Sequence, residues 1–189
     1  MRLEVHSHDS PTQGDPNPDR AVGDWPGEFS YCPMCSHPLK SRLVGSKPRP
    51  SCESCGFVHF RNPGVGAAVV LWDECGRLLL VRRGPHATRS GLWSIPAGFV
   101  DYGEDVRSGA ARELLEETGL VATIGDPAWV ATNTHDPAKI TVGIWFTGEL
   151  VGGTLAAGDD ADDVGWFDLN ELPPLAFDTD KAYIASLGR

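Results

Sequence analysis

The sequence predicts an α/β protein in two parts: an α/β/α sandwich on a mixed sheet, preceded by a small ribbon that binds a metal through four cysteines. Two observations support this prediction. Two Cys-x2-Cys pairs lie near the start of the chain, and beyond them apolar runs of strand length stand before and after one long helix-forming stretch. With 189 residues, 41% of them hydrophobic, the chain can build one ordinary domain core and a small appendage.

Composition divides the chain into three segments. Residues 1–28 contain four prolines and few apolar residues, which predicts a disordered tail. Residues 29–62 hold the paired cysteines, and residues 63–189 hold the predicted strands and helices. No apolar stretch has the length of a signal-peptide core or a membrane span, so we expect a cytoplasmic location and no membrane partner.

The strands and the last helix are predicted from apolar runs bounded by turn residues. Two runs on either side of a Cys75-Gly76 turn predict a hairpin, and a turn at Asp136-Pro137 separates a second pair of runs. In chain order, the predicted elements are strands at 65–72 and 77–83, a lead-in at 91–96, a helix at 104–118, strands at 129–134, 140–146 and 163–167, and a helix at 176–187.

The four paired cysteines predict a structural zinc site. Sixteen residues separate the pair Cys32 and Cys35 from the pair Cys52 and Cys55, a spacing typical of zinc ribbons. Four thiolates close the tetrahedral shell and leave no position for water, so the expected role is structural. Disulfides are the alternative, but nothing directs the chain to an oxidising compartment. The fifth cysteine, Cys75, is expected to be a free thiol.

The ribbon segment is locally basic, which leaves a second role open. Such a segment could meet nucleic-acid phosphates, or it could dock on an acidic surface, and we favour a structural or dimer-contact role. His37 and His59 are expected to be bystanders, because four cysteines already complete a zinc site. The basic residues are Lys40, Arg42, Lys47, Arg49 and Arg61, against the single acid Glu53.

An acidic segment bounded by glycines carries the predicted chemistry. From Gly98 to Leu120 it runs GFVDYGEDVRSGAARELLEETGL. Residues 104–118 favour a helix, with acid from Asp101 or Glu104 near its first turn. Gly119 is placed to end the helix in a left-handed conformation. Four apolar residues at helical spacing are expected to face the core: Ala110, Ala111, Leu114 and Leu115.

Three glutamates of this helix predict a site for a hard cation. Glu113, Glu116 and Glu117 share one helix face, with Cβ atoms about 5–6 Å apart. Carboxylates this close repel one another, and oxygen-only ligands favour Mg²⁺ or Mn²⁺. Arg112 can pair with one of the carboxylates. The net charge of −10 means that an anionic diphosphate would need such cations as a bridge. The alternative is a solvated acidic helix face.

The segment resembles the Nudix box, G-x5-E-x7-R-E-U-x-E-E-x-G-U with U apolar, at every defining position. The resemblance implies a metal-dependent hydrolase that cleaves a diphosphate linking a nucleoside to another group. It also implies that Glu104 orients a ligand or water and that Arg112 holds the carboxylates. The implied catalytic residues are Glu104, Arg112, Glu113, Glu116 and Glu117, and the implied magnesium or manganese ligands are Gly98, Glu113, Glu116 and Glu117.

The ribbon and the box together are similar to zinc-ribbon Nudix proteins, which include NADH pyrophosphatases and FAD/ADP-ribose pyrophosphatases. The NADH branch carries S-Q-P-W-P-F-P-x-S after the box, where this chain has GDPAWVATNTHD. The later stretch DDVGWFDLNELPPLAF instead resembles the FAD/ADP-ribose type. The resemblance therefore implies ADP-ribose or FAD as substrate. One departure is Ser36, at a position where such knuckles usually have glycine.

Residues outside the box are expected to bind the substrate: Arg83, Trp93, Phe99 and Asp160. Core packing is the alternative for the aromatic residues, and solvation is the alternative for Arg83 and Asp160. Asp160 belongs to an acidic run that could instead supply a metal ligand or the general base. Other functions stay open: hydrolysis of NADH, CoA or another nucleotide, or a Nudix-fold sensor or nucleic-acid binder that uses the ribbon. A small-molecule partner is favoured over nucleic acid, and a homodimer fits the family.

Overall fold

The computed structural model describes residues 29–187, so the predicted tail at 1–28 lies outside the described residues. The chain divides into two compact units, Met1–Asn62 and Pro63–Arg189, here called unit 1 and unit 2. Within the part that is described, no helix is both long enough and apolar enough to cross a membrane.

Unit 1 is built around a two-stranded antiparallel ribbon, β1 (Lys40–Val44) and β2 (Lys47–Ser51). Gly45 lies in the turn between them with φ of 64°, a left-handed conformation that glycine adopts without a steric penalty. The small core of this unit consists of Cys32, Leu39 and Cys52. So few buried apolar residues give little hydrophobic stabilisation, and a fold of this size usually needs a further cross-link.

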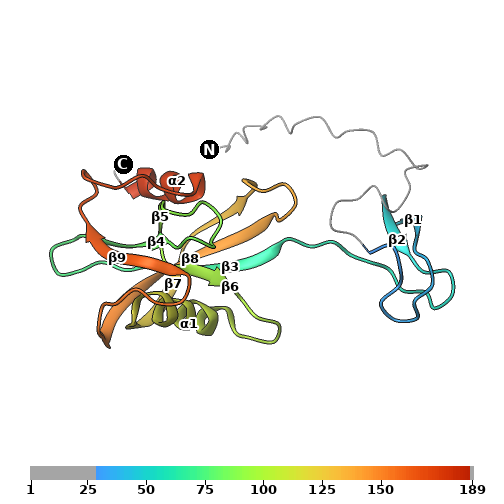
Figure 1. The fold of residues 1–189 in the computed structure, drawn as a ribbon, viewed down its shortest axis with the longest axis horizontal. Coiled ribbons are helices and arrows are strands. Elements are labelled where there is room, and N and C mark those ends of the chain that lie inside the picture. Colours follow the sequence, from blue (N-terminus) through green and yellow to red (C-terminus); the bar gives the residue numbers. More distant parts are fainter. Residues whose placement is uncertain (1–28, 188–189) are drawn as a thin grey trace, which may run out of the picture. The chain divides into compact units, whose positions relative to one another are not determined.

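Unit 2 is an α/β/α sandwich with a mixed sheet, as the sequence predicts. One sheet has the strand order β6-β3-β8-β7, in which β3 and β8 are parallel and the other pairs antiparallel. A second, antiparallel sheet has the order β5-β4-β9, and the two helices lie on opposite sides of the strands (Figure 1). The elements are β3 (Gly64–Val70), β4 (Leu78–Arg83), β5 (Trp93–Ser94), β6 (Ala97–Phe99), α1 (Val106–Thr118), β7 (Leu120–Asn133), β8 (Thr141–Gly153), β9 (Ala161–Phe167) and α2 (Asp178–Leu187).

Strand periodicity divides the core of unit 2 into two clusters. Ala67 and Val69 of β3 point to the side of α1, where they pack with Leu114. Ala68 and Val70 point to the other side, into a cluster that includes Tyr183 of α2. Because side chains alternate along a strand, a run that is apolar at every position serves both faces of a sheet covered by helices.

The predicted hairpin around Cys75-Gly76 is wrong beyond its tip. The turn forms, since the Asp73 carboxylate accepts the backbone N–H groups of Cys75 (3.0 Å) and Arg77 (2.8 Å). After one bridge between Trp72 and Leu78, however, β3 and β4 enter different sheets. β4 pairs instead with β9, from near the end of the chain. A local turn signal does not determine which distant strand completes a sheet.

The central helix begins later than predicted. It starts at Val106 because Asp105 is its N-cap, with a side chain that accepts the N–H groups of Arg107 and Ser108. No acidic residue lies in the first turn. The end is as predicted: Gly119 has φ of 69° and donates its N–H to Leu115. Leu115 itself was expected in the core, but its exposed fraction is 49%, while Ala110 and Leu114 are fully buried.

The two strands after α1 are much longer than predicted. β7 and β8 pair along most of their length, with register shifts on both sides of Pro127. Gly125, Asp126 and Pro127 have the composition of a loop, and the sequence prediction therefore began the strand only at 129. The structure accommodates them as a bulge in a continuing strand, because a bulge tolerates a residue that cannot donate to the ladder. The predicted turn at Asp136-Pro137 is confirmed.

Candidate active site and metal sites

The acidic site forms where α1 packs on β6. Gly98 of β6 pairs with Ala67 of β3, and the carboxyl group of Glu113 lies directly against the Gly98 Cα. A Cβ atom at position 98 would collide with that carboxyl group, so only glycine leaves room for it. The close approach explains in steric terms why this position of the motif is glycine.

Arg112 holds the cluster together with five hydrogen bonds from its guanidinium group. Its Nε and Nη2 donate to the two carboxylate oxygens of Glu104, both at 3.0 Å. Nη1 donates to Glu113 (2.9 Å) and Glu116 (3.0 Å), and Nη2 also donates to the Phe99 carbonyl at 3.0 Å. The predicted pairing of Arg112 with box carboxylates is therefore present. A planar guanidinium suits this task because its donors lie in one rigid plane.

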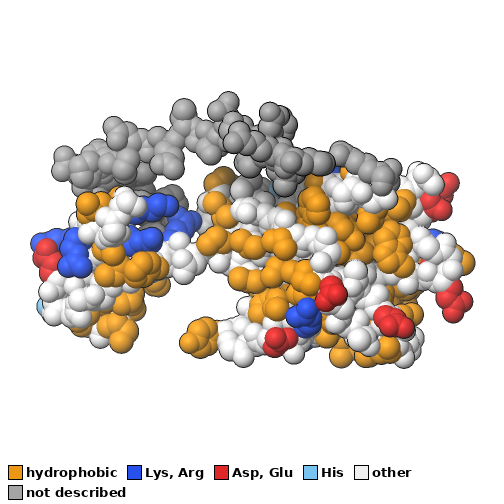
Figure 2. All heavy atoms as spheres, turned by 180° about the vertical axis from the view of Figure 1, so that it is seen from behind, with side chains coloured by type: hydrophobic (Ala, Val, Ile, Leu, Met, Phe, Trp, Pro, Cys, Tyr) orange, Lys and Arg blue, Asp and Glu red, His pale blue; other side chains and the backbone are white. Residues whose placement is uncertain are grey.

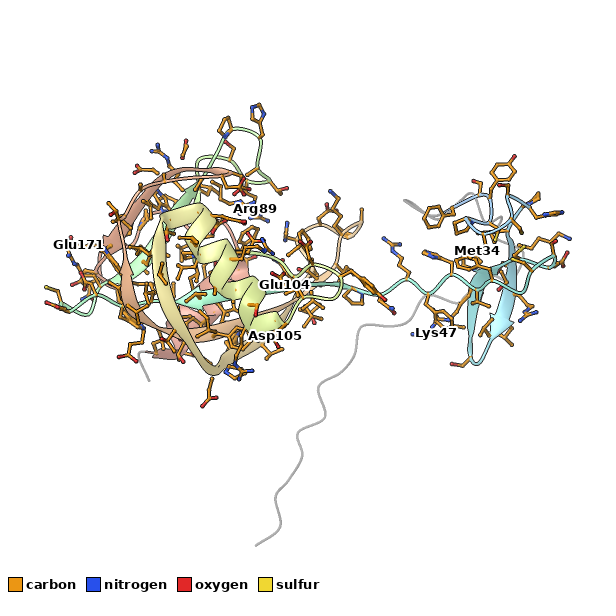
Figure 3. All side chains as sticks on the ribbon, turned by 90° about the horizontal axis from the view of Figure 1, so that it is seen from below. Met34, Lys47, Arg89, Glu104, Asp105 and Glu171 are labelled. Carbon is orange, nitrogen blue, oxygen red and sulfur yellow. The ribbon has the colours of Figure 1, made fainter. Side chains whose placement is uncertain are left out.

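Glu104 lies just before α1, next to the capping residue Asp105 (Figure 3). Its carboxylate also accepts the Asp101 backbone N–H at 3.0 Å. The hydrogen bonds from Arg112, followed by that from Asp101, hold the pKa of the Glu104 carboxyl down at about 2. Glu104 is therefore ionised throughout the neutral range and serves as an anchor for Arg112. Its place before the helix differs from the predicted place inside it.

Glu117 is the buried acid of the site. Its exposed fraction is 3%, and its Oε2 accepts the Ala97 backbone N–H at 2.9 Å. Burial raises the pKa of this carboxyl to about 8, with further repulsion from Asp160 and Glu113. Burial also raises the pKa of Glu113. A cation bound near these two carboxyl groups would stabilise their ionised forms.

The three box carboxylates do not all converge on one point. Among the described residues, the four cysteines of unit 1 form the one set of three or more potential ligands whose atoms all lie within 4.8 Å of one another. Arg112 binds Glu113 and Glu116, while Glu117 turns towards Ala97. The donor set still suits a hard divalent cation, because the carboxylates of Glu113, Glu116 and Glu117 offer only oxygen atoms.

A cavity of about 410 Å³ opens beside this cluster. Arg83, Phe99 and Asp160, predicted as substrate contacts, line it together with Glu113 and Glu117. Asp160 reaches the cavity because its carbonyl accepts the Gly84 N–H at 2.7 Å, which holds its loop against the end of β4.

Trp93 was also predicted to contact the substrate, but it is not among the residues that line the cavity. Its ring packs against Phe167 with centroids 4.7 Å apart, and it belongs to the core cluster on the α2 side. The apolar environment available to Trp93 in the core explains this placement. We therefore do not propose Trp93 as a substrate contact.

Several cavity residues were not found by the sequence prediction. Asp180 is a buried acid among them: its carboxylate accepts the Ile95 N–H at 3.2 Å and the Trp145 indole N–H at 3.0 Å. Burial raises its pKa to about 6. An acid in the first turn of a terminal helix usually means capping, so the sequence alone gives no sign of this role. The others that matter below are Asn133, His135, Lys139, Phe177 and Thr179.

The four predicted zinc ligands lie together in unit 1. All four sulfur atoms are within 4.8 Å of one another, with Cys32 and Cys55 at 3.5 Å and Cys35 and Cys52 at 3.4 Å. Tetrahedral zinc with Zn–S bonds of about 2.3 Å needs sulfur atoms about 3.8 Å apart, so this set fits. Hydrogen bonding from the Cys55 backbone lowers the pKa of the Cys52 thiol to about 6, while the pKa values of the neighbouring Cys35 and Cys55 thiols are raised, so the fit to zinc rests on the geometry of the sulfur atoms.

The two cysteine knuckles have the same backbone geometry. Ser36 N donates to Cys32 O at 2.8 Å, and Gly56 N donates to Cys52 O at 3.0 Å. Ser36 has φ of 59° and Gly56 has φ of 78°. The serine that departs from the usual glycine therefore adopts the same left-handed conformation, at a modest steric cost. The loop keeps its shape.

Lys and Arg side chains gather on the surface of unit 1 (Figure 2). Lys40 is exposed and pairs with Glu53 at 2.8 Å, and Arg49 stacks on the Phe60 ring with its guanidinium carbon 4.5 Å from the ring centroid. These contacts engage two of the basic residues within the unit itself.

Comparisons with known proteins identify the family. A family model described as the NUDIX domain matches residues 62–187. The ADP-ribose pyrophosphatase of Methanocaldococcus jannaschii is 36% identical over 123 residues, which cover 65% of this chain and 72% of that protein. The NAD-capped RNA hydrolase NudC of Stutzerimonas stutzeri is 29% identical over 155 residues, covering 82% of this chain and 53% of that protein. The chain thus spans about half the length of this NudC relative.

A solved structure agrees with the sequence matches. The crystal structure of a NUDIX hydrolase from Nitrosomonas europaea superposes with a TM-score of 0.73 at 28% identity, covering 82% of this chain and 88% of that chain. The complete motif from Gly98 to Leu120, the α/β/α sandwich around it and these matches lead to one conclusion: the chain belongs to the Nudix hydrolase family.

Proposed function

We propose that this enzyme hydrolyses the diphosphate bond of a nucleoside diphosphate derivative, with ADP-ribose as the favoured substrate. The observation that carries the proposal is the carboxylate cluster organised by Arg112 at one end of a 410 Å³ cavity. A cavity of this volume is in the range that small-molecule ligands occupy. The similarity to an ADP-ribose pyrophosphatase supports ADP-ribose over the other substrates.

We propose that Glu113, Glu116 and Glu117, with the carbonyl of Gly98, hold Mg²⁺ or Mn²⁺. When bound, such a cation offsets the negative charge of the diphosphate and lowers the pKa of a coordinated water. Arg112 keeps Glu113 and Glu116 in place, and Glu104 keeps Arg112 in place. Asp160 lies within electrostatic reach of Glu117 and can act on the same water as a base or as a further ligand.

For unit 1 we propose a structural Zn²⁺ held by Cys32, Cys35, Cys52 and Cys55. Residues 29–62 would then form a zinc ribbon and residues 63–189 the hydrolase domain. The zinc would compensate for the very small core of the ribbon, since structural zinc contributes about 10 kcal/mol or more to the folding of such segments. We propose a homodimer as the assembly of the full protein, on the family resemblance alone.

A second substrate class comes from the NudC relatives, which are named NAD-capped RNA hydrolases. The basic surface of unit 1 is compatible with an RNA phosphate backbone. The absence from this chain of the S-Q-P-W-P-F-P-x-S signature weighs against the NADH-cleaving type. ADP-ribose therefore stays the first choice, with FAD and NAD-derived substrates next.

The test compares ADP-ribose, FAD, NADH and an NAD-capped RNA as substrates with Mg²⁺ or Mn²⁺, and identifies the products by mass. We expect AMP and ribose 5-phosphate from ADP-ribose. The Glu117→Gln variant should lower turnover about 10³-fold, because it removes a charge that stabilises the transition state through the metal. Glu149→Gln, on an exposed strand position, is the matched control and should keep full activity.

Two results would contradict the proposal. One is a Glu117→Gln variant that folds, as judged by circular dichroism, and turns over as fast as the unsubstituted enzyme. The other is a protein that cleaves none of the four substrates with either metal but binds RNA tightly and with strong salt dependence, which would favour the nucleic-acid binder instead.

A further inference from the structure

The cavity extends well beyond the acidic cluster, and its far end has a different chemistry. There it is lined by the turn between β7 and β8, by the residues at the start of α2, and by the facing strands β3 and β8. The lining includes the carboxylates Glu113, Glu117 and Asp160 at the acidic end, Asp136 and Asp180 on the β7–β8 turn and α2, and the cations Arg83 and Lys139. A ligand that fills the whole cavity would therefore meet both carboxylates and cations.

An aromatic pair stands at the far end. The rings of His135 and Phe177 have centroids 5.0 Å apart at an interplanar angle of 50°. The guanidinium carbon of Arg83 lies 5.1 Å from the centroid of the Phe177 ring. Phe177 thus contacts both a cation and a second ring, and all three side chains line the cavity. Such a group offers stacking surface for a flat, electron-rich ligand.

The aromatic pair is held by contacts with the backbone and with neighbouring side chains. Arg83 Nε donates to the Thr88 carbonyl at 2.6 Å, and His135 Nδ1 pairs with Asn133 Oδ1. Arg89 donates from Nη1 to the Ala176 carbonyl at 2.7 Å and so fixes the residue before Phe177. A subsite whose side chains are already positioned loses less conformational entropy when a ligand binds.

The floor of the cavity is nearly without side chains. Gly66 of β3 pairs in register with Gly143 of β8, and Ala68 is two residues along the same face. A Cβ atom at Gly143 would lie 2.7 Å from the Trp145 ring, so the floor depends on glycine there. Above it, the Thr179 hydroxyl is buried and has no hydrogen-bond partner among the described residues. A buried hydroxyl of this kind is a ready contact for a polar ligand atom.

Arg83 connects the two ends of the cavity. Its positive charge partly opposes the burial that raises the pKa values of Glu117 and Asp180, and its guanidinium stacks on Phe177. A group with a phosphate next to a ring would place the phosphate near Arg83 and the ring near Phe177.

We propose that Phe177 and His135, with Arg83 beside them, form the subsite for the nucleobase of the substrate. The proposal rests on the proposed function in one respect, because it assumes that the diphosphate lies at the acidic end. The ligand class is a nucleoside 5′-phosphate, whose flat base can stack. A ribose phosphate has no aromatic ring to stack and would gain little from Phe177.

The test measures binding of AMP and of ribose 5-phosphate to the full chain by calorimetry, in buffer without magnesium or manganese. AMP should bind and ribose 5-phosphate should bind at least tenfold more weakly. Phe177→Ala should weaken AMP binding about tenfold, the size of one base–aromatic stack, while Phe177→Tyr should keep affinity within about threefold. His135→Ala, at an exposed position, should weaken AMP binding about threefold without disturbing the fold.

The matched control is Phe60→Ala, which removes another arginine-stacked phenylalanine that lies in unit 1. It should leave AMP affinity unchanged. The subsite is overturned if AMP does not bind, if ribose 5-phosphate binds as well as AMP, or if Phe177→Ala and His135→Ala both bind AMP like the unsubstituted chain. Because no hydrolysis is involved, AMP binding that depends on Phe177 would uphold the subsite even if no dinucleotide is cleaved.

Discussion

Gly98 shows how a single residue joins the backbone to the proposed chemistry. The carboxyl group of Glu113 occupies the space that any Cβ at position 98 would need. Gly98→Ala should therefore displace Glu113 and lower turnover of ADP-ribose about 10²-fold, the cost typical of misplacing a catalytic group by about 1 Å. The measurement is kcat with circular dichroism as a check of folding.

Gly152→Ala is the matched control for that experiment. A Cβ at position 152 meets no atom within 4 Å, and the residue has no positive φ, so activity should be unchanged. Equal activity of Gly98→Ala and Gly152→Ala would show that the close approach of Glu113 to Gly98 has no catalytic importance.

Asp180 should leave a signature in the pH dependence of stability. Burial raises its pKa to about 6 from an ordinary value of 3.8, against the lowering effects of its hydrogen bonds and of Arg83. The folded state then holds the proton more tightly than the unfolded chain, so the contribution of Asp180 to stability falls as pH rises from about 4 to about 6. Asp180→Asn cannot titrate. We therefore compare the free energies of unfolding of the two proteins. The advantage of the unsubstituted chain over Asp180→Asn should fall by about 2 kcal/mol between pH 4 and pH 7.

Denaturant unfolding at a series of pH values measures this difference. Parallel stability curves for the two proteins would show that Asp180 ionises as easily in the folded chain as in the unfolded one.

At the scale of elements, the start of α1 depends on one side chain. Asp105 caps the helix through the N–H groups of Arg107 and Ser108, and it lies at the N-terminal end of α1 in Figure 3. Asp105→Ala should lower the free energy of unfolding by about 1 kcal/mol, because two donors lose their acceptor. Glu171→Ala, at another exposed acid labelled in Figure 3, should change stability little. Chemical denaturation measures the loss of stability in both variants. An equal loss in both would show that the Asp105 cap does not stabilise the helix.

The sequence predicts the central helix well because its determinants are local. Helix propensity, the spacing of the glutamates and the terminal Gly119 all act within one segment, and the structure has the helix ending at the expected residue. The start was misplaced because Glu104 and Asp105 are both acids that suit a first turn, and only geometry shows that Asp105 is the cap. Leu115 shows the same limit, since the width of the buried stripe depends on what packs against it.

The sheet and the far end of the cavity could not be predicted because they depend on distant pairing. Nothing near β4 indicates that β9 will lie beside it. His135 lies in a polar turn. Phe177 lies about 40 residues later in the chain, directly before a helix. Single residues of this kind become a pair only when the β7–β8 turn and α2 come together. The Nudix box is recognisable because its function requires fixed spacing, whereas a substrate subsite requires only proximity in space.

At the scale of the whole molecule, the two units should lose structure separately. Cys52→Ser removes one proposed zinc ligand, so the zinc content should fall from about one ion per chain and unit 1 should unfold, because structural zinc supplies most of the stability of such ribbons. Unit 2 has its own two core clusters and should keep its melting transition and its hydrolytic activity. Elemental analysis and calorimetry measure the two effects.

Cys75→Ser is the control for the zinc experiment. Cys75 is exposed in the turn before β4 and lies outside the cysteine cluster, so zinc content should not change. Normal zinc content in Cys52→Ser would argue against the four-cysteine site, and loss of hydrolysis in a variant that keeps the unit 2 transition would give the ribbon a catalytic role.

The short segment between β5 and β6 is tied at both ends, by Asp180 of α2 to Ile95 and by Glu117 of α1 to Ala97. The terminal helix therefore helps to hold the segment next to the proposed site even though it contributes nothing to the family motif. A homologue truncated before α2 would retain every box residue and yet release the strand that aligns its buried glutamate. An intact motif in a shortened gene product is thus insufficient evidence for a working enzyme.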